Sequence, residues 1–306
     1  MKGSIKSQVY YLIKQLDGIG KSKKEIRNQS EEYGQNGRKV SPLIHSYKYQ
    51  NDIKNTAKQL MIFAKENYQV KNCELISNDI LENFIKQKVN SGLTYRTIST
   101  YIGHLQKISL GLKNIANAKG KPYKAFDENG LKTVSNFKQK NAKKSKYINR
   151  SYINVDRIIS NLENFEHILV AKMQLESGVR ATEALRFRPD QLKNNNQIEV
   201  KIKGGNTILV TVSDMIYNTI EQKIIQAIAN NEIGFKVEYY KYYKDLKRAV
   251  KASGETWTGT HGMRYTYAQR RINELANDGI DFEKAQLIVS KEMGHKRAKI
   301  TSHYLG

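Results

Sequence analysis

The apolar residues of the first half of the chain recur with a helical period, and this feature constrains the fold more than any other. Four amphipathic runs show the period, at residues 5–16, 53–64, 77–92 and 94–108. Ser77 is suited to cap the third run, because its side-chain oxygen can accept from the first backbone N–H groups of a helix. We therefore assign residues 41–135 to a small helical domain and treat residues 1–40 as an amino-terminal arm or leader.

The second half combines helical runs with one segment of a different period. Helical spacing recurs at residues 155–159, 167–175, 213–229, 239–251, 260–276 and 282–293. Residues 197–212 instead alternate apolar and polar side chains around Gly204 and Gly205, which is typical of a β-hairpin. The expected fold class is mainly α: a helical domain, then at residues 151–306 a mixed, mostly helical domain with a small antiparallel β-sheet.

The charge of the chain is strongly positive and uneven. Lys and Arg number 52 against 29 Asp and Glu, a net charge of +23, and residues 1–150 hold 29 of the basic but only 11 of the acidic residues. A field of this sign favours a polyanion, with nucleic acid first and an anionic membrane surface second. No apolar run approaches the ~18 residues of a membrane span, so we expect no membrane association through the chain itself.

The densest basic stretch predicts a solvated linker between the two domains, at residues 136–150. It includes six basic residues and no acidic one from position 138 onward. Such a linker can close on a phosphate backbone, although the same composition also serves solubility. The candidate DNA-binding residues are Lys138, Lys140, Lys143, Lys144 and Lys146, together with Arg96.

Cysteine usage indicates the compartment. Cys73 is the single cysteine, which excludes an intramolecular disulfide framework and a Cys-based zinc site. The first residues show no secretion signal. We expect a cytoplasmic protein that associates with the nucleoid of a bacterial cell when it binds DNA.

The carboxy-terminal half places cationic and proton-transferring residues at helix ends and turns. Arg180 follows a glycine at a helix break, and Glu183 lies one turn later, where a carboxylate can hold a guanidinium. His261 and Arg264 are three residues apart, so they point to the same side of one helix. His295 follows a glycine at a later helix end. Each feature alone is common and more often structural.

Taken in order, these features resemble the motifs of the tyrosine recombinase, or phage-type integrase, family. The similar segments are SGVRATEAL at 177–185, Lys203 before Gly204 in the hairpin, THGMRYTYA at 260–268, MGH at 293–295 and SHYL at 302–305. The resemblance covers residues 150–306 by motif. It covers residues 40–130 by layout, as the SAM-like helical core-binding domain that this family places before its catalytic domain.

The resemblance implies that Tyr304 attacks a DNA phosphodiester and forms a 3′-phosphotyrosyl link, with no cofactor, ATP or metal ion. A phenol is weakly nucleophilic at its usual pKa of ~10, so it must lose its proton as it attacks. A phosphodiester is an anion, and forked arginine contacts neutralise its oxygens. The implied roles are phosphate clamp for Arg180 and Arg264, base for His261, general acid for Lys203, phosphate hydrogen bonding for His295 and orientation of the clamp for Glu183.

The expected function is site-specific recombination, in which four protomers exchange strands between two DNA duplexes through a Holliday junction. It would serve DNA integration or excision by a phage or mobile element, and an accessory directionality factor is a further candidate partner. A type IB topoisomerase shares the same residue set and is one alternative. A non-catalytic DNA-binding regulator derived from a recombinase is another.

Three departures from the family pattern bear on these expectations. Tyr265 stands where the family often has His, and we expect it to be tolerated because that position is not usually a phosphate contact. Lys201 lies two residues from Lys203 on the same strand face and could replace it in another hairpin register. The chain ends two residues after Tyr304, so protomers couple through another element, such as the helix at 282–293, or the sequence is shortened.

Overall fold

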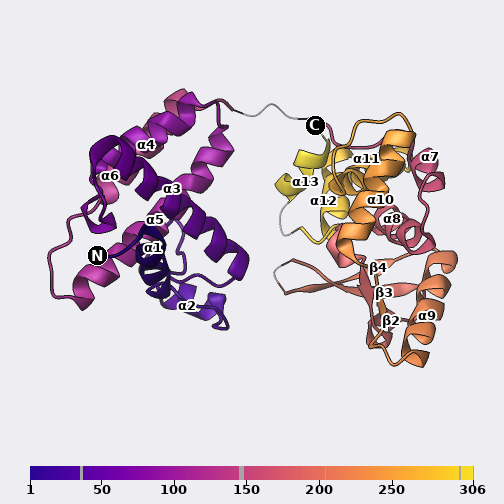
Figure 1. The fold of residues 1–306 in the computed structure, drawn as a ribbon. Coiled ribbons are helices and arrows are strands. Elements are labelled where there is room, and N and C mark those ends of the chain that lie inside the picture. The colour runs from indigo at the N-terminus through magenta and orange to yellow at the C-terminus, as the bar shows by residue number, and fades with distance from the viewer. Residues whose placement is uncertain (35–36, 145–147, 204, 296–297, 306) are drawn as a thin grey trace. The chain divides into compact units, whose positions relative to one another are not determined.

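The computed structural model describes residues 1–34, 37–144, 148–203, 205–295 and 298–305. The chain divides into two compact units, Met1–Lys146 and Tyr147–Gly306 (Figure 1). Each unit buries a hydrophobic core of its own.

The first unit is built from helices. They are α1 (Ile5–Lys14), α2 (Lys23–Gln29), α3 (Tyr47–Tyr68), the short η1 (Cys73–Leu75), α4 (Asn78–Asn90), α5 (Tyr95–Ala118) and α6 (Glu128–Asn141). The predicted cap is confirmed, because the Ser77 side chain accepts from the backbone N–H of Ile80 at 3.4 Å. Helix α3 packs against α1 and α5, and α6 packs against α4 and α5.

This unit extends beyond its predicted bounds of 41–135 at both ends. Leu12 and Leu16, in and just after α1, are fully buried in its core, so residues 5–16 belong to the domain rather than to a separate arm. Helix α6 takes up the first part of the predicted linker at 136–150, because Leu131 and Val134 anchor it in the same core.

The second unit surrounds helix α8 and carries the predicted small sheet. Its helices are α7 (Val155–Ser160), α8 (Phe165–Ser177), η2 (Ala181–Glu183), η3 (Pro189–Gln191), α9 (Asp214–Ala229), α10 (Tyr239–Ala252), α11 (His261–Asn277), α12 (Phe282–Glu292) and α13 (Ala298–Leu305). Its strands are β1 (Arg186–Phe187), β2 (Leu192–Lys193), β3 (Gln197–Lys201), β4 (Thr207–Thr211) and β5 (Phe235–Lys236). The expected class, mainly α with a small antiparallel sheet, is confirmed.

The strands of the second unit form two small antiparallel sheets, and one of them contains the predicted hairpin. Strands β2, β3 and β4 form an antiparallel sheet in that order, and β1 pairs with β5 in a separate antiparallel pair. The predicted hairpin is confirmed, with Gln197 opposite Thr211 and Lys201 opposite Thr207. Lys203 therefore lies in the turn that joins β3 to β4.

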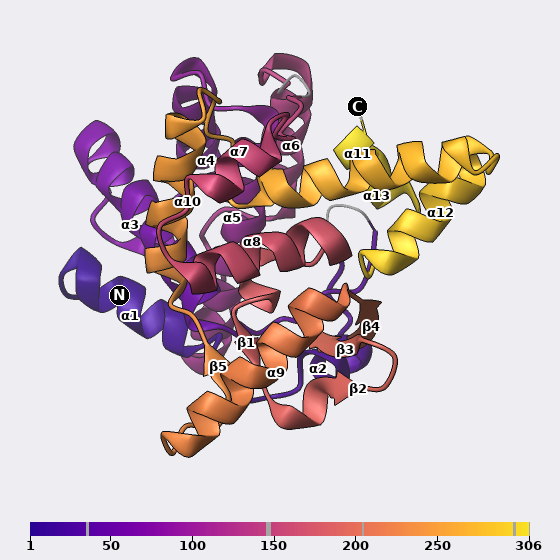
Figure 2. The same ribbon diagram turned by 90° about the vertical axis from the view of Figure 1, so that its right-hand side faces the viewer.

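Helices α11, α12 and α13 pack together at the carboxy-terminal end of the unit (Figure 2). Tyr267 of α11, Val289 of α12 and Tyr304 of α13 belong to one buried cluster. Gly294 after α12 adopts a left-handed conformation with φ of 68°, and a Cβ there would lie 2.7 Å from Ile202. Only glycine therefore lets the end of α12 pack this close to the β3–β4 hairpin.

Candidate active site

Arg180 is positioned by the glycine that ends α8. Gly178 has a φ of 65°, and a Cβ on it would come within 2.3 Å of the Tyr267 ring, so the chain turns sharply here. Two residues later, Arg180 Nη1 donates to Glu183 Oε1 at 2.8 Å, and the Arg180 backbone N–H donates to Glu183 Oε2 at 2.8 Å. The carboxylate thus holds both the side chain and the main chain of the arginine.

Glu183 also ties the hairpin turn to this arginine. The Glu183 side chain is only 6% exposed, and its Oε1 accepts from the backbone N–H of Lys203 at 3.2 Å. The Lys203 side chain is exposed. This contact brings Lys203, rather than Lys201, to the carboxylate that holds Arg180.

Arg264 is fully buried at the centre of the unit. Its Nη2 donates to the carbonyl of Met293 at 2.7 Å and lies 2.8 Å from His295 Nε2, and its Nη1 donates to the carbonyl of Gly178. Its Nε has no hydrogen-bond partner within the described part of the chain. One arginine therefore joins the ends of α8 and α12 and keeps a donor group unsatisfied.

The two histidines are neutral at physiological pH. Burial, together with the positive charges of Arg264 and Arg180, lowers the pKa of His261 to about 4. Burial and the same two arginines lower the pKa of His295 to about 4. Because Arg264 is a donor, His295 Nε2 must accept, so Nδ1 carries the proton and donates to Thr301 Oγ1 at 2.9 Å.

Tyr304 of α13 places its ring against three side chains of the cluster. Its ring centroid lies 4.5 Å from that of Tyr265, 5.4 Å from that of His295 and 6.4 Å from that of His261. Arg264 Cζ lies 5.7 Å from the same centroid, over the ring. The tyrosine is 8% exposed, so its surroundings are fixed by packing.

The structure thus brings all the sequence-predicted catalytic candidates to one place. Arg264 contacts His295 and the main chain next to Arg180, the Tyr304 ring packs beside both histidines, and Glu183 connects Arg180 to Lys203. Fixed cationic donors beside a phenol and neutral imidazoles can bind an anion and move a proton, which is what phosphoryl transfer needs.

Sequence reasoning missed two residues that contact the tyrosine. Tyr265, which we expected only to be tolerated, packs its ring on that of Tyr304, and Gln269 donates to the Tyr304 carbonyl at 2.9 Å. Both follow His261 on α11 at steps of four residues, which puts all three on one helix face. That spacing was the available signal.

The candidate DNA-binding residues divide by exposure. Arg96, Lys140, Lys143 and Lys144 are exposed, and Arg96 lines a cavity of about 600 Å³ in the first unit. Lys138 is corrected: it is buried in α6 with its ammonium 4.5 Å from the centroid of the Tyr95 ring, so it is not presented to a phosphate backbone. Lys146 lies outside the described residues.

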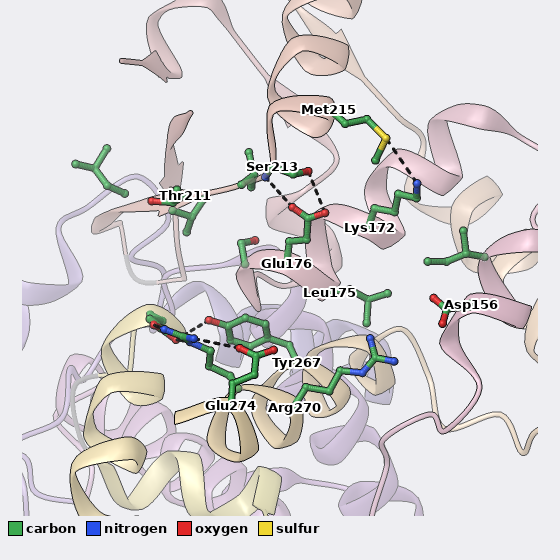
Figure 3. A pocket seen from close by; sticks show the side chains of 17 residues that line it. Asp156, Lys172, Leu175, Glu176, Thr211, Ser213, Met215, Tyr267, Arg270 and Glu274 are labelled. Atoms are coloured by element: carbon green, nitrogen blue, oxygen red, sulfur yellow. Dashed lines mark hydrogen bonds and ion pairs between the residues drawn. The ribbon is translucent and has the colours of Figure 1, made fainter. Parts of the chain in front are cut away.

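A separate cavity of about 720 Å³ opens beside the cluster, between α8, β4, α11 and the end of α12 (Figure 3). Tyr267 lines it and donates from its hydroxyl to Glu292 at 2.6 Å, and Arg271 pairs with the same carboxylate at 3.2 Å. The Tyr267 ring also lies against Gly178. The contacts of Tyr267 and Arg271 with Glu292 therefore stabilise the turn before Arg180.

Two further properties concern metal binding and membranes. Among the residues that the structure describes, no group of three or more His, Cys, Asp or Glu side chains is arranged to hold a metal ion. No helix within that part of the chain is long and apolar enough to cross a membrane.

The motif-bearing unit also matches a known family. The model of the phage integrase family matches residues 152–306, about half of the chain, and this span includes the whole cluster around Tyr304. The chain belongs to the phage integrase family. The resemblance to tyrosine recombinases is thereby confirmed, whereas a comparison with curated proteins finds no match.

Solved structures of other integrases and recombinases share the fold. The XerH site-specific recombinase bound to its difH substrate is 16% identical with a TM-score of 0.61, over 100% of this chain and 94% of that one. The Tn1549 transposon integrase with circular intermediate DNA is 13% identical with a TM-score of 0.57, over 100% and 95%. A lambda integrase dimer bound to a COC′ core site is 16% identical with a TM-score of 0.57, over 85% and 89%.

Proposed function

We propose that this phage integrase family protein is a site-specific DNA recombinase that cuts and rejoins DNA through a covalent bond to Tyr304. The observation that carries the proposal is the placement of the Tyr304 ring beside Arg264, His261 and His295. A buried arginine next to a phenol, whose Nε finds no hydrogen-bond partner among the described residues, favours an anion as the missing partner.

The proposed step balances bonds and protons over named side chains. The Tyr304 oxygen forms a bond to phosphorus as the bond from phosphorus to the 5′-oxygen breaks. The phenol proton goes to His261, and the Lys203 ammonium donates a proton to the leaving 5′-oxygen. A 5′-hydroxyl from another strand reverses the step, so the phosphotyrosyl bond is resealed without an external energy source.

The two arginines are proposed to bind the phosphate, and they also lower the pKa of the proposed base. Arg180 and Arg264 are held by Glu183 and by backbone carbonyls, so their donors are oriented before DNA arrives. Their charges also lower the pKa of His261. A bound phosphodiester offsets those charges, and we expect the pKa of His261 to rise on binding, which makes it a better acceptor when the proton must move.

Double-stranded DNA is the proposed substrate. The XerH and lambda integrase structures that share the fold are complexes with a recombination substrate and a core site. The excess positive charge of residues 1–150, including exposed Lys140, Lys143 and Lys144, supports the same substrate class. We further propose that four protomers assemble on two duplexes, and that an accessory directionality factor takes part.

Covalent capture tests this function and selects the target sequence in the same experiment. The protein is mixed with nicked duplexes that carry a random-sequence core, and adducts that survive detergent are isolated and sequenced. A recombinase selects a defined core, and two copies of that core in a plasmid support excision. Relaxation of any supercoiled plasmid without a selected core would instead identify a type IB topoisomerase.

A further inference from the structure

Gln269 of α11 contacts two distant parts of the second unit at once. Its Nε2 donates to the Tyr304 carbonyl at 2.9 Å and to Asn149 Oδ1 at 2.9 Å. A primary amide nitrogen carries two N–H groups, so both bonds form together. The Tyr304 carbonyl is among the last four of α13, which have no partner inside the helix. The amide therefore caps the helix that carries the tyrosine.

Asn149 is itself fixed in a local turn. Its Oδ1 also accepts from the Ser151 backbone N–H at 3.0 Å and from Ser151 Oγ at 2.9 Å, as in an Asx turn. The same oxygen thus receives donors from its own segment and from α11. The Gln269 side chain is therefore held by its hydrogen bond to Asn149 as well as by its hydrogen bond to the Tyr304 carbonyl.

The segment around Asn149 also reaches the loop before His261. Arg150 Nη2 donates to the Thr258 carbonyl at 2.8 Å, and Thr258 Oγ1 donates to the Arg150 carbonyl at 2.7 Å. This segment leads into the second unit from the basic stretch that contains Lys143 and Lys144. It therefore reaches the proposed nucleophile through Gln269 and directly contacts the loop that leads to the proposed base.

We infer that Gln269 is a positioning residue that couples the placement of Tyr304 to the segment joining the two units, through Asn149. The inference rests on the proposed function, because positioning matters only if Tyr304 reacts. Gln269 sets the main chain of the tyrosine while Tyr265 packs on its ring, so together they fix where the phenol lies. Without the Asn149 acceptor, this amide would keep only the Tyr304 carbonyl as a partner, and its hold on α13 would weaken.

Hydrogen exchange in the DNA-free protein tests the coupling independently of activity. Gln269→Leu and Asn149→Ala should each speed exchange of the α13 amides about fivefold, because each removes one side of the same contact. Asn149→Asp keeps the acceptor and should retain protection. Gln226→Leu replaces an exposed glutamine of α9 and controls for the change of side chain. Wild-type protection of α13 in Asn149→Ala would overturn the coupling.

Cleavage of the captured duplex in a single turnover gives the functional readout. At saturating DNA, Gln269→Leu should cleave about tenfold more slowly with its dissociation constant for DNA unchanged. The double variant with Asn149→Ala should be no slower than Gln269→Leu alone, because both changes act on one contact. A 5′-thiolate leaving group, which needs no proton, should not rescue Gln269→Leu. Additive losses, rescue or a wild-type rate would overturn the inference, whereas absence of any adduct with the unaltered protein would refute the proposed function itself.

Discussion

Replacing Arg180 with alanine should slow DNA cleavage about 100- to 1,000-fold. Arg180 is 23% exposed and is held by Glu183 through Nη1; its other guanidinium nitrogens make no hydrogen bond within the described part of the chain, and we expect them to bind the phosphate. Loss of one preorganised donor to a transition-state oxyanion typically costs about 2.7–4 kcal/mol. The expected rate loss follows from that range, because each 1.36 kcal/mol changes a rate tenfold.

The same substitution should lower the free energy of unfolding by less than it raises the barrier to cleavage. Glu183 loses the charged partner at 2.8 Å but keeps two backbone N–H donors, those of residues 180 and 203, which the substitution does not remove. Losing a hydrogen bond to a charged group costs at most about 1.5–3 kcal/mol. Arg180→Lys should recover little activity, since one ammonium cannot serve Glu183 and a phosphate in the forked geometry of a guanidinium.

The assay is adduct formation on the captured duplex in a single turnover, with the melting temperature of each variant measured alongside. Arg157→Ala is the matched control, because Arg157 is an exposed arginine of α7. The control should react like the wild type. A folded Arg180→Ala variant that cleaves at the wild-type rate would show that the phosphate clamp is wrongly placed.

Three further outcomes are expected. Lys203→Ala should lose cleavage of an ordinary duplex and regain it on one with a 5′-thiolate leaving group, which needs no general acid; failure of that rescue would remove Lys203 from this role. The pKa values of His261 and His295 are lowered from 6.5 to about 4 in the folded protein. The stability that these neutral histidines contribute is therefore complete above pH 6.5 and is lost as the pH falls towards 4. The melting temperature should therefore fall over this window, and a flat profile would contradict it. Replacing Lys143 and Lys144 with Gln should reduce the salt dependence of DNA binding by ~0.9 per lost phosphate contact, and an unchanged slope would assign them to solubility alone.

Hydrophobic period predicted most of the helices, because amphipathic runs need only local spacing and a buried face. The last part of α6, residues 136–141, was misread as linker because Phe137 is its one apolar residue among polar and basic ones. This helix joins the domain through tertiary contacts with the core, and local composition does not reveal such contacts. The same holds for α1, whose apolar face is buried against α3 and α5 although the polar residues after it suggested an arm.

The candidate site was predicted by motif, but its mutual contacts were not. Spacing placed His261 and Arg264 on one side of a helix, yet nothing in it shows that Arg264 reaches the carbonyls of Gly178 and Met293. Tertiary packing decides such contacts. It also decides which lysines face solvent, which is why the buried Lys138 was assigned wrongly to DNA binding.

The most direct test of the account is to identify the residue that carries the DNA. The covalent adduct is formed on the captured duplex, digested with protease and nuclease, and the modified peptide is sequenced by mass spectrometry. We expect a single phosphotyrosyl bond at Tyr304 and no adduct with Tyr304→Phe, which should still bind the duplex. An adduct on another residue, or one that survives in Tyr304→Phe, would show that Tyr304 is not the nucleophile.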